Sequence, residues 1–587
     1  MGVERVNMAS WRIWAGRRTA ALALGTVLVG AGLVAACSSH PGAASGPVAE
    51  QGEGILGRTA LSAYLAGRLA QAEGDTRAAA DYYTAALKYD PDNADLLQRA
   101  FTLMVAEGRL EQAMPLAERL LDFDSDAPLP LLVAGLRAAR DGHFEQSEKH
   151  FSALPKRGVF GFLSPLLVAW SKVGAGQIDP ALESLAALSA VQGLEPMRAY
   201  HAGLINDLAG RADAADAAYL QALDGQASIR LVEAAGAFHQ RAGRPEQAKA
   251  LYDRYLGEHP DTLLIDGGRL LAQDRSIPRT VPDASAGMAE ALFDMGSLMR
   301  QGGALDMAMV FSRLTLALRP DFALAHMNVA DILSSQGRYA EGNAAYQAIP
   351  ATSPVAEFGR LRVAMNLEEM GQTEAALRNL DVLARERPDG LDALVTKGDI
   401  LRRQQRFADA ATAYDAAIRR VPQLASHHWP LLYSRGIAYE RSGEWSKAEA
   451  DFQKALELRP DQPDVLNYLG YSWIDKGMHL AEARAMIEKA VTLRPRDGAI
   501  VDSLGWALYR MGEFQGAVKA LERAVELKPE DPTINDHLGD AYFQVGRFPE
   551  ANFQWKRALS LEPEAEMLET LEEKVRSGTL PAVPLSK

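Results

Sequence analysis

Small and apolar residues recur with a fixed spacing along this chain. Two consecutive segments near the C-terminus, one ending at Pro529 and the next at Pro563, align over 34 positions. A proline ends each segment and cannot continue a helix, because it has no N–H and clashes with the preceding turn. A glycine near the middle of each segment suits a tight turn. The pattern therefore predicts a pair of helices in each segment, repeated along the chain.

The aligned positions identify the type of repeat. The matching residues are Gly505 and Gly539, Gly512 and Gly546, Ala517 and Ala551, and Ala524 and Ala558. They resemble the tetratricopeptide repeat (TPR), which has a small residue at its eighth position, alanines at the twentieth and twenty-seventh, a bulky residue at the twenty-fourth and a proline at the thirty-second. In that family the small residue lies where the two helices touch, and the bulky residue fills the gap between repeats.

The same frame returns along most of the chain. Clear repeats surround Gly67, Gly236, Gly398 and Gly436, and weaker copies begin near residues 94, 128, 162, 196, 289, 323 and 357. The copies near 94 and 162 are degenerate, and the repeat near 463 carries an insertion at Met478-His479-Leu480. The resemblance covers about residues 60–563. It implies an all-α TPR superhelical solenoid of about 14 repeats, and a polar helix after Pro563 is expected to cap it.

The repeats break in two places, 262–287 and 423–428, and the longer break predicts a boundary between two arrays. The expected organisation has six parts. They are a signal peptide (1–36), a lipidated cysteine with a flexible tether (37–58), an N-terminal TPR array (59–261), an irregular linker (262–288), a C-terminal TPR array (289–563), and a capping helix with a tail (564–587).

The first segment is typical of a targeting signal. Three arginines precede an uncharged apolar run that ends in Val34-Ala35-Ala36-Cys37, and Cys37 is the single cysteine of the chain. This resembles the bacterial lipoprotein signal, which implies cleavage before Cys37 and a diacylglycerol on its thiol. Ser38, which follows, implies sorting to the periplasmic side of the outer membrane, with the inner membrane as the alternative. A non-cleaved anchor is the alternative to lipidation, although the apolar run is short for a membrane span.

Charge restricts the class of partner. The chain carries a net charge of −14, and its first 36 residues carry four arginines against Glu4, so the rest is more acidic still. Phosphate binding needs a basic surface, which argues against nucleic acid. We found no catalytic motif, no paired cysteines and no convincing metal set; His427-His428 lack acidic or thiol companions. The sequence therefore predicts a protein that is not an enzyme and needs no cofactor or metal.

The first helix of each repeat lines the concave groove in the TPR family, which implies where a partner would bind. In the last three repeats the groove positions combine aromatic rings and carboxylates, which suggest a basic or amide-rich ligand. Alternatively, neighbouring repeats cover these rings, or they are ordinary superhelix surface. The candidate residues are Asp464, Asn467, Tyr471, Asp475, Asp502, Trp506, Tyr509, Asp536, Asp540 and Phe543.

The whole layout also resembles a group of proteobacterial TPR lipoproteins, through the segments LNYLGYSWIDKG and VDSLGWALYRMGEF. One type in that group holds a periplasmic carboxyl-terminal processing protease together with its cell-wall hydrolase substrates. The expected function is thus a lipid-anchored periplasmic adaptor that binds proteins or peptides. The alternatives are an assembly factor for exported polysaccharide or outer-membrane proteins and, from another class, a cell-wall hydrolase with accessory TPRs.

Overall fold

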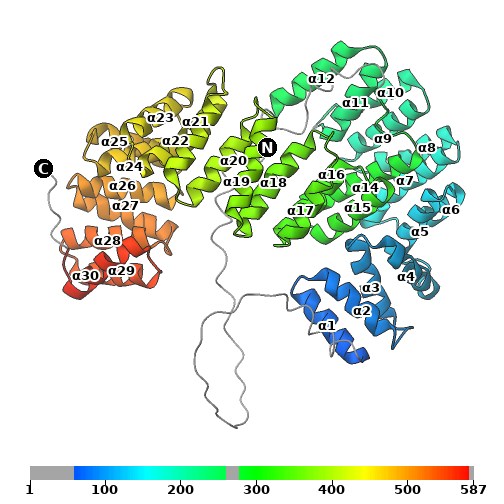
Figure 1. Cartoon of the computed structure of the whole chain (residues 1–587), viewed down its shortest axis with the longest axis horizontal. Helices are drawn as coiled ribbons and strands as arrows, with labels where there is room; N and C mark the ends of the chain where they lie inside the picture. The colour runs from blue at the N-terminus through cyan, green and yellow to red at the C-terminus, as the bar shows by residue number, and fades with distance from the viewer. Residues whose placement is uncertain (1–58, 226, 260–276, 581–587) are drawn as a thin grey trace, which may run out of the picture.

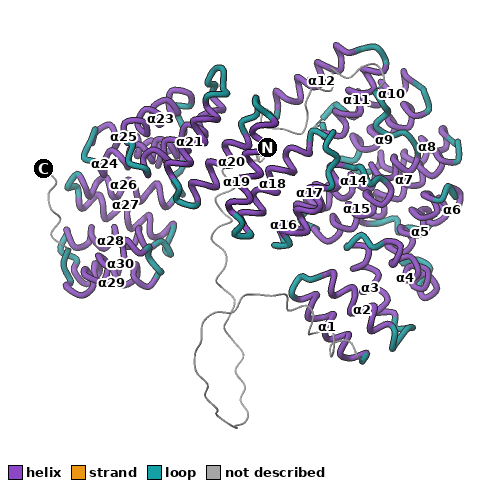
Figure 2. Tube along the Cα trace, in the orientation of Figure 1, coloured by secondary structure: helices purple, strands orange, loops and turns teal. Residues whose placement is uncertain are grey.

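A computed structural model describes residues 59–225, 227–259 and 277–580 of the chain (Figure 1). Within these residues the regular structure is entirely helical, with 29 α-helices and two short 3-10 helices and no strand (Figure 2). The α-helices form fourteen antiparallel hairpins, and α30 (Ala565–Ser577) packs on the last of them. The predicted solenoid of about fourteen repeats with a capping helix is therefore confirmed.

The first six hairpins form the N-terminal array. Their helices are α1 (Ala60–Ala72), α2 (Thr76–Leu87), α3 (Ala94–Ala106), α4 (Leu110–Phe123), α5 (Pro128–Arg140), α6 (Phe144–Ser152), α7 (Gly158–Gly174), α8 (Ile178–Ser184), α9 (Glu195–Leu208), α10 (Ala212–Ala222), α11 (Ile229–Arg241) and α12 (Pro245–Glu258). The repeat predicted near residue 94 is regular, whereas the one near 162 ends in the short α8 and the 3-10 helix η3 (Leu185–Ala190).

The remaining hairpins continue the solenoid to the capping helix. Their helices are α14 (Ala284–Gln301), α15 (Leu305–Leu318), α16 (Ala323–Ser335), α17 (Tyr339–Gln347), α18 (Val355–Glu369), α19 (Thr373–Glu386), α20 (Asp392–Arg403), α21 (Phe407–Ile418), α22 (Trp429–Arg441), α23 (Trp445–Leu458), α24 (Pro463–Asp475), α25 (Leu480–Leu493), α26 (Gly498–Arg510), α27 (Phe514–Leu527), α28 (Pro532–Gln544) and α29 (Phe548–Ser560). The 3-10 helix η4 (Ser426–His428) precedes α22 and lies in the predicted insertion at 423–428.

The turn inside each hairpin confirms the role predicted for glycine. All but one of the fourteen turns contain a glycine with a positive φ, in the left-handed region where a side chain is disfavoured. The exception is Gln405, with φ 59°, between α20 and α21. The insertion at Met478-His479-Leu480 has a second strained residue, because His479 takes φ 46° as the residue before α25.

Close contact between the two helices of a hairpin explains the small residue at the eighth position. A Cβ added to Gly398 would lie 2.5 Å from the ring of Tyr414, and one added to Gly539 would lie 2.5 Å from the indole of Trp555. Both rings are fully buried. A larger residue at either glycine would force the helices apart, so the glycine and the bulky ring form one packing unit.

The hairpins together form a curved body, with the N-terminal array at one side and the helices from α20 onward at the other (Figure 1). The predicted linker at 262–288 differs from the structure at its C-terminal end, because α14 begins at Ala284. Residues 260–276 lie outside the described part. Helices α14 and α15 share one apolar core with the N-terminal array, which runs from Ala63 to Leu314. The break in the repeat pattern is therefore not a break in packing.

Candidate functional site

The concave side of the N-terminal array is filled by the chain itself. Helix α14 packs against α7 and α9, and α15 packs against α3 and α5 (Figure 1). Both α9 and α14 have buried residues on every side, as expected of helices enclosed all round. Trp170 of α7 is fully buried, and a Cβ added to Gly287 of α14 would overlap its indole ring. This part of the solenoid offers a partner no open groove.

Buried charges hold α14 in place. Glu290 of α14 is fully buried and accepts hydrogen bonds from Arg230 Nε at 3.1 Å, Arg319 Nη1 at 3.2 Å and the Tyr200 hydroxyl at 3.3 Å. One turn further along α14, Asp294 lies 3.2 Å from His201 Nε2. Burial raises the pKa of Asp294, although the contact with His201 opposes the shift. Two guanidinium groups around one enclosed carboxylate indicate a permanent contact, because breaking it would leave buried charges unpaired.

A second group of charged contacts joins the N-terminal array to the hairpins after α14. Arg338, in the turn between α16 and α17, donates to Glu107 at 3.0 and 3.1 Å and to the Thr76 hydroxyl at 2.7 Å. Nearby, Arg313 Nε donates to the Ala106 carbonyl at 3.2 Å. These contacts join residues more than two hundred positions apart, so α15–α17 and α2–α3 form one body.

The ten groove candidates lie on α24, α26 and α28, the first helices of three successive hairpins. Most of their carboxylates pair with cations of the same chain. Asp464 pairs with Arg494 at 3.0 Å, and Asp475 with Arg510 at 3.2 Å. Asp502 is buried and lies 2.9 Å from Nδ1 of His537. The carboxylates therefore connect neighbouring repeats. They are already paired and do not form an open acidic groove for a basic ligand.

The contact with Asp502 raises the pKa of His537. Burial alone would lower the pKa of His537, but the charge and hydrogen bond of Asp502 outweigh it, and the pKa is raised. The imidazole also lies over Trp506, with ring centroids 4.1 Å apart and planes 17° from parallel. Tyr509 stacks on the same indole at 4.9 Å and 10°. Trp506 is thus partly buried beneath two neighbouring rings.

Two enclosed polar atoms on α24 and α26, Asn467 Oδ1 and Trp506 Nε1, have no hydrogen-bond partner among the described residues. Tyr471, by contrast, is only partly buried. Burial, followed by the charges of Asp502 and Asp475, raises the pKa of Tyr471 to about 12, so its hydroxyl is a donor at neutral pH. Unpaired polar groups are uncommon inside proteins and require an explanation.

The last two carboxylate candidates contact the capping helix. Lys574 of α30 has a buried side chain, and its Nζ lies 2.8 Å from Asp536 Oδ1 and 2.9 Å from Asp540 Oδ2. Asp540 also accepts from Trp555 Nε1 at 2.8 Å. Burial and the charge of Asp536 raise the pKa of Asp540 to about 6, with Lys574 opposing the shift. Phe543, the remaining candidate, packs edge-on to Phe548 at 5.1 Å.

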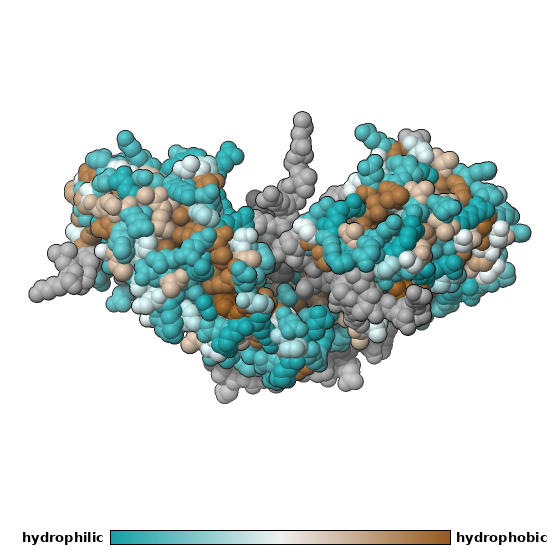
Figure 3. All heavy atoms as spheres, turned by 90° about the horizontal axis from the view of Figure 1, so that it is seen from above, coloured by the Kyte–Doolittle hydropathy of each residue, from teal (hydrophilic) through white to brown (hydrophobic). Residues whose placement is uncertain are grey.

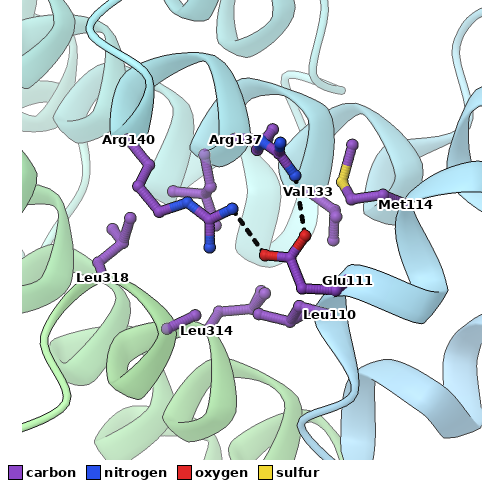
Figure 4. A pocket seen from close by; sticks show the side chains of 10 residues that line it. Leu110, Glu111, Met114, Val133, Arg137, Arg140, Leu314 and Leu318 are labelled. Atoms are coloured by element: carbon purple, nitrogen blue, oxygen red, sulfur yellow. Dashed lines mark hydrogen bonds and ion pairs between the residues drawn. The ribbon is translucent and has the colours of Figure 1, made fainter.

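A small cavity lies between the N-terminal array and α15, as Figure 4 shows. Its volume of about 30 Å³ is close to that of a single water molecule. Glu111 at its mouth pairs with Arg137 at 3.0 Å and Arg140 at 2.7 Å. The lining side chains are mostly apolar: Leu110, Met114, Val133, Leu136, Leu314, Ala317 and Leu318. A cavity of this size is far below what a small-molecule site needs, and we assign it no ligand.

Comparisons with known proteins identify repeats in the same parts of the chain. A family model described as TPR repeat matches residues 505–546, and models described as tetratricopeptide repeat match 70–138, 362–425 and 429–462. Four separate stretches of the chain therefore match tetratricopeptide repeats. A TPR repeat-containing protein of Pseudomonas aeruginosa is 26% identical over 200 residues, which cover 34% of this chain and 33% of the relative. The match thus spans about a third of the curated relative.

Several solved structures are similar to this chain at low identity. The Cut9 and Hcn1 assembly gives a TM-score of 0.36 at 15% identity, covering 87% of this chain and 96% of the solved chain. A tetratricopeptide repeat protein of Parabacteroides merdae gives 0.35 at 16%, covering 49% and 98%. Yeast Tom70 gives 0.31 at 13%, covering 88% and 95%.

The structure adds functional detail that the repeat sequence did not reveal. Trp170, Trp473 and Trp555 are buried core residues. Neither Glu290 nor Lys574 was a candidate, since a lone charge on a predicted TPR helix is usually exposed. The surface seen in Figure 3 is mostly polar, with apolar patches on both sides of the body. None of the described helices is both long and apolar enough to cross a bilayer.

Proposed function

We propose that this protein is a non-catalytic scaffold that binds partner proteins on the concave side of its C-terminal TPR array. One observation carries this proposal. The N-terminal array is filled by α14, whereas α24 and α26 carry a stack of partly buried aromatic rings, Trp506 and Tyr509, near the partly buried Tyr471. Tyrosine and tryptophan are frequent anchors of protein interfaces, because one part of the side chain is apolar and the other can form a hydrogen bond.

The contacts also indicate the chemistry of the bound segment. Because Asp464, Asp475 and Asp502 already pair with cations of the chain, a strongly basic ligand would have to displace those partners. A polypeptide backbone instead supplies neutral donors and acceptors in alternation. Such a backbone could accept a hydrogen bond from the partly buried Tyr471 hydroxyl. An extended, uncharged segment is therefore the ligand that the groove fits best.

The N-terminal motif supports a location for the scaffold. The segment Val34-Ala35-Ala36-Cys37 and the Pro- and Gly-rich stretch after it have the form of a lipoprotein signal and tether, although they lie outside the described residues. We propose that the chain is attached through a lipid on Cys37 to the periplasmic side of the outer membrane. The layout further favours an adaptor that brings substrates, including cell-wall hydrolases, to a periplasmic processing protease.

Capture of partners from a membrane extract tests the groove. The variant with Tyr471→Phe and Trp506→Phe removes the tyrosine hydroxyl and replaces the stacked indole by a smaller ring. Losing the tyrosine hydrogen bond costs about 0.5–1.5 kcal/mol, and the smaller ring offers a partner less stacking surface, so we expect partner capture to fall roughly tenfold. Tyr89→Phe is the matched control, because Tyr89 is 54% exposed and lies outside the C-terminal array. We expect it to leave capture unchanged.

Quantitative mass spectrometry of the captured proteins separates the parts of the proposal. Equal capture by the double variant and the parent would show that the C-terminal groove is not the binding site. If the proteins that depend on the groove include no protease, the processing role is wrong while the scaffold role stands. Release of soluble fragments from peptidoglycan by the purified chain would contradict the non-catalytic assignment.

A further inference from the structure

The first helix of the solenoid has an uncovered row of leucines. Leu61, Leu65 and Leu69 are 67%, 55% and 60% exposed, and their spacing of four residues places them on one side of α1. The opposite side of α1 packs against α2 through small buried residues, namely Ala63, Ala66, Gly67 and Ala70. Single exposed leucines are ordinary, but three in a row make an apolar stripe. We call these three residues the α1 stripe.

The charge around the α1 stripe differs from that of the rest of the chain. Between Ala60 and Ala72 there is no aspartate or glutamate, and the one charged residue is the exposed Arg68. The whole chain, by contrast, carries a net charge of −14. A helix face with leucines, an arginine and no carboxylate is compatible with an anionic lipid surface, where apolar burial and attraction to headgroups act together.

The position of α1 in the chain brings it close to the proposed anchor. Residues 38–58 separate Cys37 from Thr59, the residue before α1, and that length of chain reaches at most ~70 Å. A lipid on Cys37 would keep α1 within this distance of the bilayer at all times. Tethering of this kind raises the effective concentration of the second contact, so a weak apolar face would be occupied.

We infer that the α1 stripe lies on the surface of an anionic bilayer and forms a second membrane contact beside the lipid on Cys37. The inference rests on the lipid anchor in the proposed function. A second copy of the chain is a poorer occupant, because three leucines on one short helix offer much less than the roughly 800 Å² per partner of a stable interface. Contact through α1 would orient the solenoid, with the free end of its N-terminal array toward the membrane (Figure 1).

Site-specific fluorescence on the lipidated full-length protein in phosphatidylglycerol-containing vesicles tests the inference. Cys37 is the one native cysteine, so a lipidated chain offers a single thiol when Leu65→Cys is introduced and labelled with an environment-sensitive dye. Leu220→Cys is the matched control, since Leu220 on α10 is 61% exposed. At position 65 we expect strong quenching by spin-labelled lipid and protection from aqueous iodide. At position 220 we expect the reverse.

Three results at position 65 have distinct meanings. Quenching by iodide, as at position 220, would place the stripe in water and overturn the inference. Protection from both quenchers would mean that a second copy or another segment of protein covers the stripe, which also overturns it. A further variant excludes an effect of the dye. With the label on Ala72→Cys, changing all three leucines to serine should abolish lipid quenching, and circular dichroism should be unchanged.

Vesicle flotation and the mass of the Cys37 peptide separate the stripe from the anchor. Flotation of lipidated protein without lipid quenching at position 65 would overturn the stripe and leave the anchor standing. Flotation of protein whose Cys37 peptide carries no lipid, lost when the leucines become serine, would support the stripe and contradict the anchor. Failure of the parent chain to float would overturn both.

Discussion

Replacing Glu290 with glutamine tests whether the N-terminal array is held closed by its buried charges. Glu290 is fully buried, and three donors converge on it from Tyr200, Arg230 and Arg319. Glutamine keeps the shape of the side chain but removes the negative charge. Losing one partner of a buried ion pair costs about 3–5 kcal/mol, chiefly because the remaining charge stays buried and uncompensated.

The environment of the two arginines places the expected cost at the low end of this range. Arg230 keeps Glu233 at 2.7 Å, and Arg319 keeps Asp321 at 3.4 Å. Glutamine can also accept one of the hydrogen bonds through its neutral oxygen. We therefore expect a loss of about 3 kcal/mol in the local stability of α14, which corresponds to roughly 100-fold faster exchange of its backbone amides.

Hydrogen exchange read by mass spectrometry is the suitable assay, because a repeat array does not unfold as one unit. Peptides from α9, α11 and α14 should lose protection in Glu290→Gln, while peptides from α26 should not change. Glu111→Gln is the matched control. Glu111 also pairs with two arginines, but its side chain is 67% exposed, and we expect no measurable effect.

Two outcomes would refute this reasoning. Exchange in α14 that rises less than tenfold, or no more than in Glu111→Gln, would show that the buried pairs add little to the closure. Protection lost equally in α26 would show that the solenoid unfolds cooperatively over its whole length, contrary to the local coupling expected of repeats.

The other predictions concern packing, pH and the capping helix. Gly287→Ala should destabilise α14 by about 1–3 kcal/mol or more, because its Cβ would overlap the buried Trp170 indole. Hydrogen exchange in α7 and α14 measures this loss, and unchanged protection would contradict the packing. His537 has a raised pKa, so its pairing with Asp502 stabilises α26 and α28 below about pH 6.5 and is lost as the pH rises through the folded-state pKa. Asp540 on α28 also titrates near pH 6, so the test is the difference between parent and His537→Gln in intrinsic-rate-corrected exchange of these helices. That difference should follow the titration of His537, and equal profiles would refute its role. Lys574→Met should leave Asp536 and Asp540 without their cation and lower the local stability of α30 by about 3 kcal/mol. Limited proteolysis measures this loss, and an unchanged cleavage rate would argue against it.

The sequence alone determined the local architecture, because each repeat is built from contacts close together in the chain. Gly398 and Tyr414, or Gly539 and Trp555, are sixteen residues apart, so their pairing recurs as a pattern that can be read. The turn glycines are equally local, since a positive φ is a property of one residue. For this reason the helices and their pairing followed from the spacing of residues.

Only the tertiary structure decided which groove is open. The contact of Glu290 with Arg230 and Tyr200 joins residues 60 and 90 positions apart, and that of Arg338 with Glu107 joins residues 231 apart. The repeat period does not relate such residues to one another. Their contact depends on the small rotations between successive repeats, which add up along the solenoid. The pairing of Lys574 with Asp536 was likewise hidden, since the capping helix lies outside the repeat. Local packing is therefore specified by short-range pattern, whereas the free surface of a solenoid is specified by its global curvature.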